Sequence, residues 1–480
     1  MLILKESQLH SRGSCSPSLE DEGAARRSSP SDGLGATGRM GFHRLLQYKH
    51  VLLLQGPNGP FFARLRNYLQ AAGRAVTKVN FNAGDDLFYR GGTVVRFKEP
   101  MPEWDVFLRR LILDRQVDAV VVFGSSRRHH RIAARVASEL GIAFWVFEEG
   151  YVRPDYITLE ANGVNADSPL VKLSLDQIPE VPRPLRRQRF ENTFRKMAWH
   201  SFLYFAAGVV GQKAYPHYRH HKPFGLHEAA QWIRAGVRRV LYAQKERDSI
   251  KRLLADDHPP FFLVALQVYN DSQIRVHSPW KRMDDFIEWV VYSFANYAPS
   301  DAILVVKHHP MDRGHTNYAV TIANCAARFG AIGRVLYLHD AHLPSLLHHC
   351  RGLVTVNSTA GLQALYHRVP VIALGRCFYA KAGLTYQGSI DAFWTDCPPV
   401  DTRAFTRFRN NLIHSSQINS SFYADTYLID VDAEPSGVRR FYLKWFCALC
   451  LIVGDLLGTN QTALLPLKQF TSGLINVFRG

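Results

Sequence analysis

Short apolar runs alternate with amphipathic stretches in the first half of the chain. Runs at 50–56, 75–81, 117–124 and 142–150 have the length and composition of buried strands. Two stretches between them, 61–73 and 127–141, carry apolar residues at helical spacing. Strands separated by helices of this length predict a parallel sheet with helices on both faces.

The same alternation restarts in the second half. Strands are expected at 259–268, 302–310 and 334–340, with helices at 283–298, 317–330 and 343–350. The stretch 352–375 is typical of a strand, a loop, a helix and a further strand. The sequence therefore predicts an α/β fold of two Rossmann-like domains, 44–180 and 257–400, that face a cleft. Open sheets of this type bind ligands at the carboxyl ends of their strands.

Three segments do not follow this alternation. Residues 1–43 are polar and rich in Ser and Gly, which predicts a disordered tail. Residues 181–256 form a basic, aromatic helical segment, and 401–480 a C-terminal helical extension. We expect helices from about residue 436 to pack back across the first domain. The most apolar run, WFCALCLIVG at 445–454, falls short of the ~18 residues of a membrane span and predicts a buried or interfacial helix.

The charge of the chain is concentrated in the basic segment. The protein has 480 residues and a formal net charge of +17. Between Arg183 and Arg252 there are 16 Lys and Arg but four Asp and Glu, a net charge of +12. Nucleic acid and an anionic membrane surface are both candidate partners of such a stretch, and a solvated linker is the third interpretation. Seven scattered cysteines suit reduced thiols in the cytosol.

Polar residues at two strand ends of the second half form a candidate phosphate site. Backbone N–H groups and hydroxyls at a strand–helix junction suit an anion, and a lysine adds positive charge. The alternative for the Ser and Thr is plain helix capping. The candidate residues are Lys307, His309, Pro310, Asn357, Ser358 and Thr359.

A further polar cluster follows the first strand of the second half. Gln267 and Asp271 lie there, and the carboxylate could be a nucleophile, an electrostatic stabiliser or a helix cap. No metal is predicted, because the sequence has no HExxH and neighbouring histidines on a strand end point to opposite sides. No Walker A loop or dinucleotide fingerprint occurs, so no cofactor is predicted.

The first half places two carboxylates where a strand ends. Glu148 and Glu149 follow the apolar run 143–146, and Arg153 comes four residues later. One glutamate can act as general acid or base, or either can simply pair with the arginine. Gly56 and Asn58, in the loop after the first strand, are further candidates for the acceptor side of the cleft.

Taken in order, the motifs EEG, QVYNDSQI, KHHP, NSTAG and GRCFYAKAGLTYQG match a known pattern. From about residue 48 to 400 the chain resembles the capsule polysaccharide synthesis family of Gram-negative bacteria, of the KpsS/LipB type. Its second half is similar to bacterial β-Kdo transferases. The resemblance implies a GT-B glycosyltransferase that uses CMP-Kdo, or a related CMP-sugar, and a phosphatidylglycerol-type lipid. It also implies a cytoplasmic protein on the anionic surface of the inner membrane, with other capsule synthesis and export proteins as partners and no nucleic acid.

The resemblance also implies roles for single residues. Bacterial sialyltransferases of this fold carry an acidic-acidic-Gly, a His-Pro and a Ser/Thr motif, and the last two bind CMP. Retaining β-Kdo transferases imply Asp271 as nucleophile and Glu148 as acid/base, with Lys307 and His309 neutralising the phosphate. One departure is Asn270, which stands beside Asp271 where those enzymes have a second acidic residue. An inverting CMP-sialic acid-type transferase and a non-catalytic export component that binds anionic lipid are the alternatives.

Overall fold

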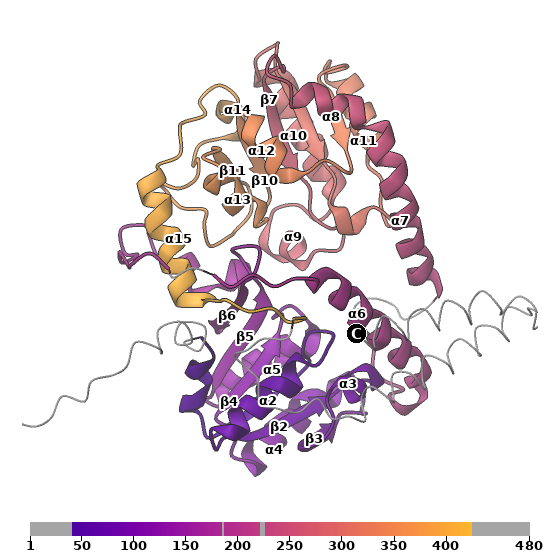
Figure 1. Ribbon diagram of the computed structural model, residues 1–480, viewed down its shortest axis with the longest axis vertical. Coiled ribbons are helices and arrows are strands. Elements are labelled where there is room, and N and C mark those ends of the chain that lie inside the picture. Colours follow the sequence, from indigo (N-terminus) through magenta and orange to yellow (C-terminus); the bar gives the residue numbers. More distant parts are fainter. Residues whose placement is uncertain (1–40, 185–186, 221–225, 425–480) are drawn as a thin grey trace, which may run out of the picture.

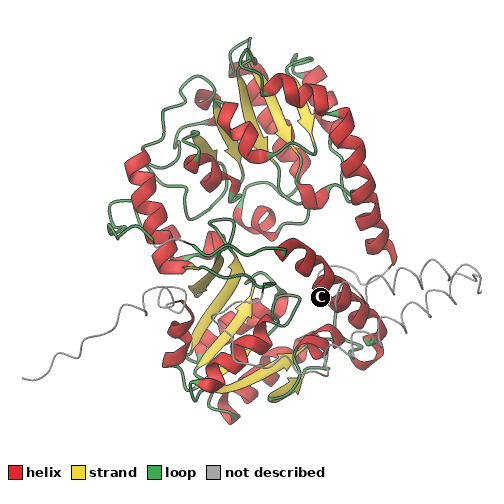
Figure 2. Ribbon diagram, in the orientation of Figure 1, coloured by secondary structure: helices red, strands yellow, loops and turns green. Residues whose placement is uncertain are grey.

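Two α/β domains, one above the other in Figure 1, make up the computed structural model, which describes residues 41–184, 187–220 and 226–424. Helices flank the strands of each sheet (Figure 2). The predicted fold class, two Rossmann-like domains that face a cleft, is confirmed by this arrangement. The predicted helices beyond about residue 436, the run 445–454 and most of the predicted tail lie outside the described residues.

The first sheet has seven strands in the order β12-β6-β5-β4-β1-β2-β3. Neighbouring strands from β1 to β5 are parallel, whereas β6 is antiparallel to β5 and β12 to β6. The strands are β1 (His50–Leu53), β2 (Ala75–Asn80), β3 (Thr93–Arg96), β4 (Ala119–Phe123), β5 (Ala143–Glu149), β6 (Ile157–Ala161) and β12 (Gln417–Ile418). The helices are α2 (Phe61–Ala71), α3 (Ala83–Phe88), α4 (Trp104–Asp114) and α5 (Arg128–Glu139), with 3-10 turns η2 (His43–Gln47), η3 (Met101–Glu103), η4 (Asn165–Asp167) and η5 (Pro169–Lys172).

The second sheet has five parallel strands in the order β11-β10-β7-β8-β9. The strands are β7 (Phe261–Ala265), β8 (Ile303–Lys307), β9 (Val335–Leu338), β10 (Gly352–Thr355) and β11 (Val371–Ala373). Around them lie α9 (Ser272–His277), α10 (Met283–Tyr297), α11 (Ala319–Arg328), α12 (Leu343–His349), α13 (Ala360–Tyr366), α14 (Ile390–Phe393) and the 3-10 turn η7 (Pro310–Asp312). The chain runs outward from β7 through β9 and then returns to β10 on the other side, so the crevice between β7 and β10 is the expected ligand position.

The basic segment is divided between the two domains. Its first helix, α6 (Thr193–Val210), packs on α3, and the Tyr204 hydroxyl accepts bonds of 2.7 Å from Gln55 and Asn82. A 3-10 turn η6 (Gln212–Ala214) follows. Helices α7 (Leu226–Lys245) and α8 (Arg247–Leu253) lie along the second domain, where Arg238 donates to the Arg313 carbonyl at 2.7 Å.

The chain returns to the first domain after completing the second. Helix α15 (Thr402–Ser416) spans the two domains in Figure 1, and β12 then pairs with β6. The Gln417 side chain accepts a 2.9 Å bond from the backbone N–H of Tyr151. Near the start of the described chain, Phe42 was predicted to lie in the disordered tail but is fully buried. It packs against Phe61 and Phe147 and is therefore part of the aromatic core of the first domain.

Candidate functional site

A cavity of about 920 Å³ lies between the domains and takes its lining from both. It brings together most of the residues predicted from the sequence. From the first domain come Glu148, Glu149 and Arg153, and from the second Gln267, Asp271, Lys307, His309, Pro310, Asn357, Ser358 and Thr359. Because these residues lie at or just after the carboxyl ends of β5, β7, β8 and β10, the strand-end rule explains their convergence.

Gly56 and Asn58 are not among the residues that line this cavity. A Cβ atom added at Gly56 would lie 2.8 Å from the Phe62 ring, so this position is closely packed. The Asn58 amide donates to the Ser201 hydroxyl of α6 at 3.3 Å. The basic segment folds over the loop after β1, and the sequence pattern gave no sign of that contact.

Gln267 connects the loops that follow β7 and β10. Its amide nitrogen donates to the Asp271 carboxylate at 3.0 Å and to the Asn357 side-chain oxygen at 2.9 Å. Its amide oxygen accepts from the Asn357 backbone N–H at 3.1 Å. The side chain is 5% exposed, so the bonds are largely shielded from water. Gln267 thus fixes the ends of β7 and β10 relative to each other across the crevice.

Lys307 and His309 differ in charge at neutral pH. Burial lowers the pKa of Lys307 to about 8, so Lys307 is protonated in most molecules at pH 7. Burial and the neighbouring Lys307 lower the pKa of His309 to about 4, so its imidazole is neutral. The His309 Nδ1 atom accepts from the Met311 N–H at 3.2 Å, which leaves the proton on Nε2. In this state His309 is uncharged and has an Nε2–H that can donate a hydrogen bond, whereas Lys307 carries the positive charge of the two.

The hydroxyls of Ser358 and Thr359 differ in their hydrogen bonds. The Ser358 hydroxyl accepts from the Ala360 N–H at 3.2 Å, so the capping interpretation holds for this residue. Thr359 occupies the cap position of α13 but makes no side-chain cap bond. Its hydroxyl is therefore the one of the pair that is not engaged in capping, and it lines the cavity.

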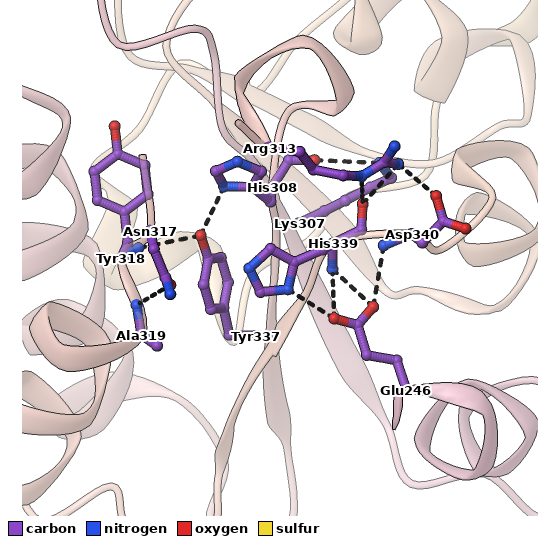
Figure 3. Close-up of polar contacts among 10 residues, drawn as sticks. All are labelled: Glu246, Lys307, His308, Arg313, Asn317, Tyr318, Ala319, Tyr337, His339 and Asp340. Atoms are coloured by element: carbon purple, nitrogen blue, oxygen red, sulfur yellow. Dashed lines mark hydrogen bonds and ion pairs between the residues drawn. The ribbon is translucent and has the colours of Figure 1, made fainter. Parts of the chain in front are cut away.

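A buried network beside the ends of β8 and β9 connects the second domain to the basic segment (Figure 3). Glu246, at the joint of α7 and α8, accepts from the backbone N–H groups of His339 at 2.8 Å and Asp340 at 3.0 Å. The His339 Nδ1 atom lies 2.7 Å from the same carboxylate. Burial alone would raise the pKa of Glu246, but these bonds outweigh it and hold that pKa below its usual value.

Two more contacts fix the same turn. The Tyr242 ring stacks on the His339 imidazole with centroids 3.7 Å apart and planes within 7°. The Arg313 guanidinium donates to the His339 carbonyl at 3.1 Å and pairs with the Asp340 carboxylate. Tyr242 and Glu246 lie one helical turn apart, so the end of α7 clamps the residue that follows β9. This clamp lies beside the end of β8, where the His308 backbone N–H donates to the Leu338 carbonyl at 2.7 Å.

We expect Glu246→Gln to destabilise the protein by about 2 kcal/mol, because a charged acceptor of several buried N–H groups is replaced by an amide that turns donors toward them. Asp248→Asn is the matched control, since it removes a carboxylate from the same segment but at an exposed position. Thermal unfolding should show a lower Tm for Glu246→Gln alone. Equal Tm values for the two variants would contradict a clamping role.

Glu148 and Glu149 are the last two residues of β5, where this strand pairs with β6. Glu148 is opposite Thr158 of β6, and its Oε1 atom accepts from the Glu149 N–H at 3.0 Å. Burial raises the pKa of Glu148 to about 7, and it raises the pKa of Glu149 as well. Among the described residues, no ion pair joins Arg153 to either glutamate; its Nε instead donates to the Gly150 carbonyl at 3.2 Å. A carboxyl that titrates near neutrality is suited to proton transfer.

Several residues that line the cavity were not predicted as site residues from the sequence. They are Ser125, Ser126, Tyr156, Arg183, Arg187, Tyr366, His367 and Arg409. The two serines directly follow the strand predicted at 117–124, so the strand-end rule could have found them. Arg409 carries no such signal, because only the crossing of α15 brings it to the cavity.

Within the described part of the chain, no group of three or more His, Cys, Asp or Glu side chains could hold a metal ion. His308, the neighbour of His309, instead places Nδ1 2.6 Å from the Tyr337 hydroxyl. The sequence also has a Cys-x-x-Cys spacing at Cys447 and Cys450, which lies outside the described residues.

Comparison with known proteins gives consistent family matches. The profile of the family described as "Capsule polysaccharide biosynthesis protein" matches residues 118–423. The chain is 40% identical over 382 residues to the capsule polysaccharide export protein KpsS of Escherichia coli, a match that covers 79% of this chain and 98% of that protein. It is also 40% identical over 404 residues to the capsule polysaccharide modification protein LipB of Neisseria meningitidis serogroup A, with 81% and 95% covered.

Solved structures show weaker likeness. The β-Kdo 2,7 transferase of KpsC from Thermosulfurimonas dismutans is 14% identical, with a TM-score of 0.36 over 75% of this chain and 98% of that chain. A glycosyltransferase from Rickettsia africae is 10% identical, with a TM-score of 0.35 over 86% of this chain and 100% of that chain.

Proposed function

The chain belongs to the capsule polysaccharide biosynthesis family, and from this premise we propose that it is a glycosyltransferase acting in the synthesis of the capsule's lipid anchor. The donor is CMP-Kdo and the acceptor is a phosphatidylglycerol-type lipid. The configuration of the sugar is retained. The observation that carries the proposal is one cavity that holds a lysine suited to a phosphate and carboxylates from both domains.

The donor would bind on the second domain. Lys307 faces the CMP phosphate with a positive charge, and neutral His309 and the Thr359 hydroxyl add hydrogen bonds. These groups stabilise the negative charge that grows on CMP as it leaves. Gln267 holds the Asp271 carboxylate at the mouth of the crevice, on the side of the donor sugar.

The transfer would then take two displacements. The Asp271 carboxylate attacks the anomeric carbon, forms a glycosyl ester and releases CMP. Glu148, in its deprotonated form, takes the proton from the acceptor hydroxyl, whose oxygen attacks the same carbon and displaces Asp271. Two inversions leave the configuration retained, and one carboxylate from each domain is required.

The test of this function is incubation of the protein with CMP-Kdo or CMP-sialic acid and phosphatidylglycerol, followed by mass spectrometry of the lipid. A lipid that gains one Kdo supports the proposal. Gain of sialic acid alone would favour the sialyltransferase-type alternative. No gain with either donor would favour a non-catalytic export component, to which the name of the E. coli relative also points.

For the donor site, we expect His309→Ala to weaken CMP binding about tenfold in calorimetry, and Lys307→Ala to weaken it further because a charge-assisted bond is lost. His342→Ala is a suitable control, since this histidine is exposed and does not line the cavity. CMP affinity should fall as the pH rises through about 8, where Lys307 loses its proton. Unchanged affinity in both variants would move the donor site elsewhere.

We also propose that α6 and α7 hold the protein on the anionic cytoplasmic face of the inner membrane. Both helices carry exposed apolar side chains among their cations: Phe194, Trp199, Phe202, Val209 and Val210 on α6, and Trp232, Ile233, Val237, Val240 and Leu241 on α7. Basic residues near such a surface contribute ~1 kcal/mol each. Across the described ranges, no helix is both long and apolar enough to span a bilayer.

Binding to phosphatidylglycerol vesicles should therefore weaken as salt is added and should be weaker still for Val237→Asp, which places a negative charge on the exposed face of α7. Val106→Asp is the control, because Val106 is also an exposed helical valine, 66% accessible, but lies on α4 of the first domain. Equal binding of the wild-type protein to neutral vesicles would count against this electrostatic mode.

A further inference from the structure

Four arginines line the cavity: Arg153, Arg183, Arg187 and Arg409. They come from three separate segments, namely the loop between β5 and β6, the start of the basic segment, and α15. Arg409 lies on the same face of α15 as Phe405, Leu412 and Ile413, which also line the cavity. None of the four belongs to the loops after β7, β8 and β10.

Hydrogen bonds join the first two of these segments to each other and to the chain just after β12. The Asp155 carboxylate accepts from the Phe190 N–H at 3.0 Å and lies 3.6 Å from the Arg187 guanidinium. Asn419, just after β12, donates to the Asp155 carbonyl at 2.6 Å and accepts from the Gln188 N–H at 2.6 Å. Arg187 thus lies at a junction of chain segments that are fixed by several hydrogen bonds.

Their charges are only partly compensated. Among the described residues, Arg187 is the one member of the four with a carboxylate within 4.0 Å; Arg153 donates to a carbonyl, and Arg409 lies over the Tyr366 ring at 5.6 Å. Burial raises the pKa of Tyr156, and the charges of Arg409 and Arg187 act in the opposite direction. Tyr156 lines the same cavity.

Arg153 connects this group to the glutamates. Burial sets the pKa shifts of Glu148, Glu149 and His309, and the Arg153 charge acts on all three of them. Arg153 therefore lies within electrostatic range of the two carboxylates and of His309, and all four residues line the same cavity. An anion held by the arginines would be next to the glutamates, on the side from which the acceptor is expected to enter.

We propose that Arg153, Arg183, Arg187 and Arg409 form a second anion subsite, which binds the phosphodiester of the acceptor lipid headgroup. The subsite deepens the proposed function, on which its assignment to the acceptor rests. Guanidinium groups bind phosphate oxygens through paired N–H donors, and several converging on one cavity suit a phosphodiester. Lys307 already serves the donor phosphate, so the four arginines are in excess of what CMP requires. A headgroup bound here would present its free hydroxyl to Glu148.

The direct test is calorimetry of the full chain with dihexanoyl phosphatidylglycerol in the absence of donor. We expect Arg409→Ala to weaken this binding about tenfold, since a charge-assisted bond is lost, and Arg409→Lys to restore part of it. Affinity for CMP should change less than about twofold. Arg403→Ala is the matched control, because Arg403 is an exposed arginine of the same helix that does not line the cavity.

Each other outcome has a defined meaning. Inorganic phosphate that binds as tightly as the lipid would overturn a headgroup site in favour of a general anion site. An equal loss of CMP affinity in Arg409→Ala would assign the arginine to the donor and also overturn the proposal. Lipid binding that depends on Arg409 in a protein that transfers no sugar would support the subsite while the proposed enzymatic function fails.

Discussion

Glu148→Gln should lower the rate of sugar transfer about 10³-fold while CMP affinity stays within about twofold, because general base catalysis contributes on this scale. The substituted glutamine would keep the shape of the side chain and an acceptor oxygen for the Glu149 N–H, but it cannot take a proton. The measurement is the initial rate at saturating donor and lipid, with calorimetry of CMP on the same preparations.

The pH dependence separates this role from a structural one. Burial raises the pKa of Glu148 to about 7, so as a base it is inactive below that pH and becomes active as the pH rises through it. The rate should fall again above about pH 8, where Lys307 becomes neutral. The rise near pH 7 should be absent in Glu148→Gln, while Glu149→Gln serves as the control that keeps it. A profile that loses its rise in Glu149→Gln instead would assign the base to the neighbouring residue.

Hydrophobic periodicity predicted much of the fold, because strands of a buried parallel sheet appear in the sequence as short, nearly continuous apolar runs. The strands expected at 75–81, 302–310 and 334–340 are found as β2, β8 and β9, shorter by one to several residues at their ends. The edge strands β3 and β12 were not predicted, nor was β6, which lies between β12 and β5. β12 is two residues long and is stabilised by its pairing with β6, so it has no periodicity of its own.

The cavity residues of the second domain could also be predicted from the sequence. These residues follow strands of one sheet, and strand order alone brings the ends of β7, β8 and β10 to one edge. The arginine group shows where this reasoning fails. Arg183 and Arg187 were interpreted as part of a membrane-binding stretch, yet they line the cavity. The position of Arg187 depends on Asp155 and on the bond from Gln188 to Asn419, and these partners are distant in sequence and carry no local signal.

The second large effect is expected at Asp271, where replacement by asparagine should reduce transfer at least about 10³-fold and leave CMP binding intact. The asparagine side chain would retain an oxygen to accept the 3.0 Å bond from Gln267, so the loop after β7 should keep its position. What is lost is the negative charge that attacks the anomeric carbon. Initial rates and CMP calorimetry on the same variant separate the two contributions.

Intact-protein mass spectrometry decides whether the missing charge is that of a nucleophile. The first displacement needs Asp271 but no base, whereas the second needs Glu148 to activate the acceptor. Glu148→Gln mixed with CMP-Kdo should therefore gain the mass of one sugar, and the double variant with Asp271→Asn should gain none. An adduct that persists in the double variant would place the nucleophile on another residue. If Asp271→Asn turned over at the wild-type rate and no adduct formed, Asp271 would be a helix cap, and Glu148 as the sole base would direct the acceptor onto the sugar in one inverting step.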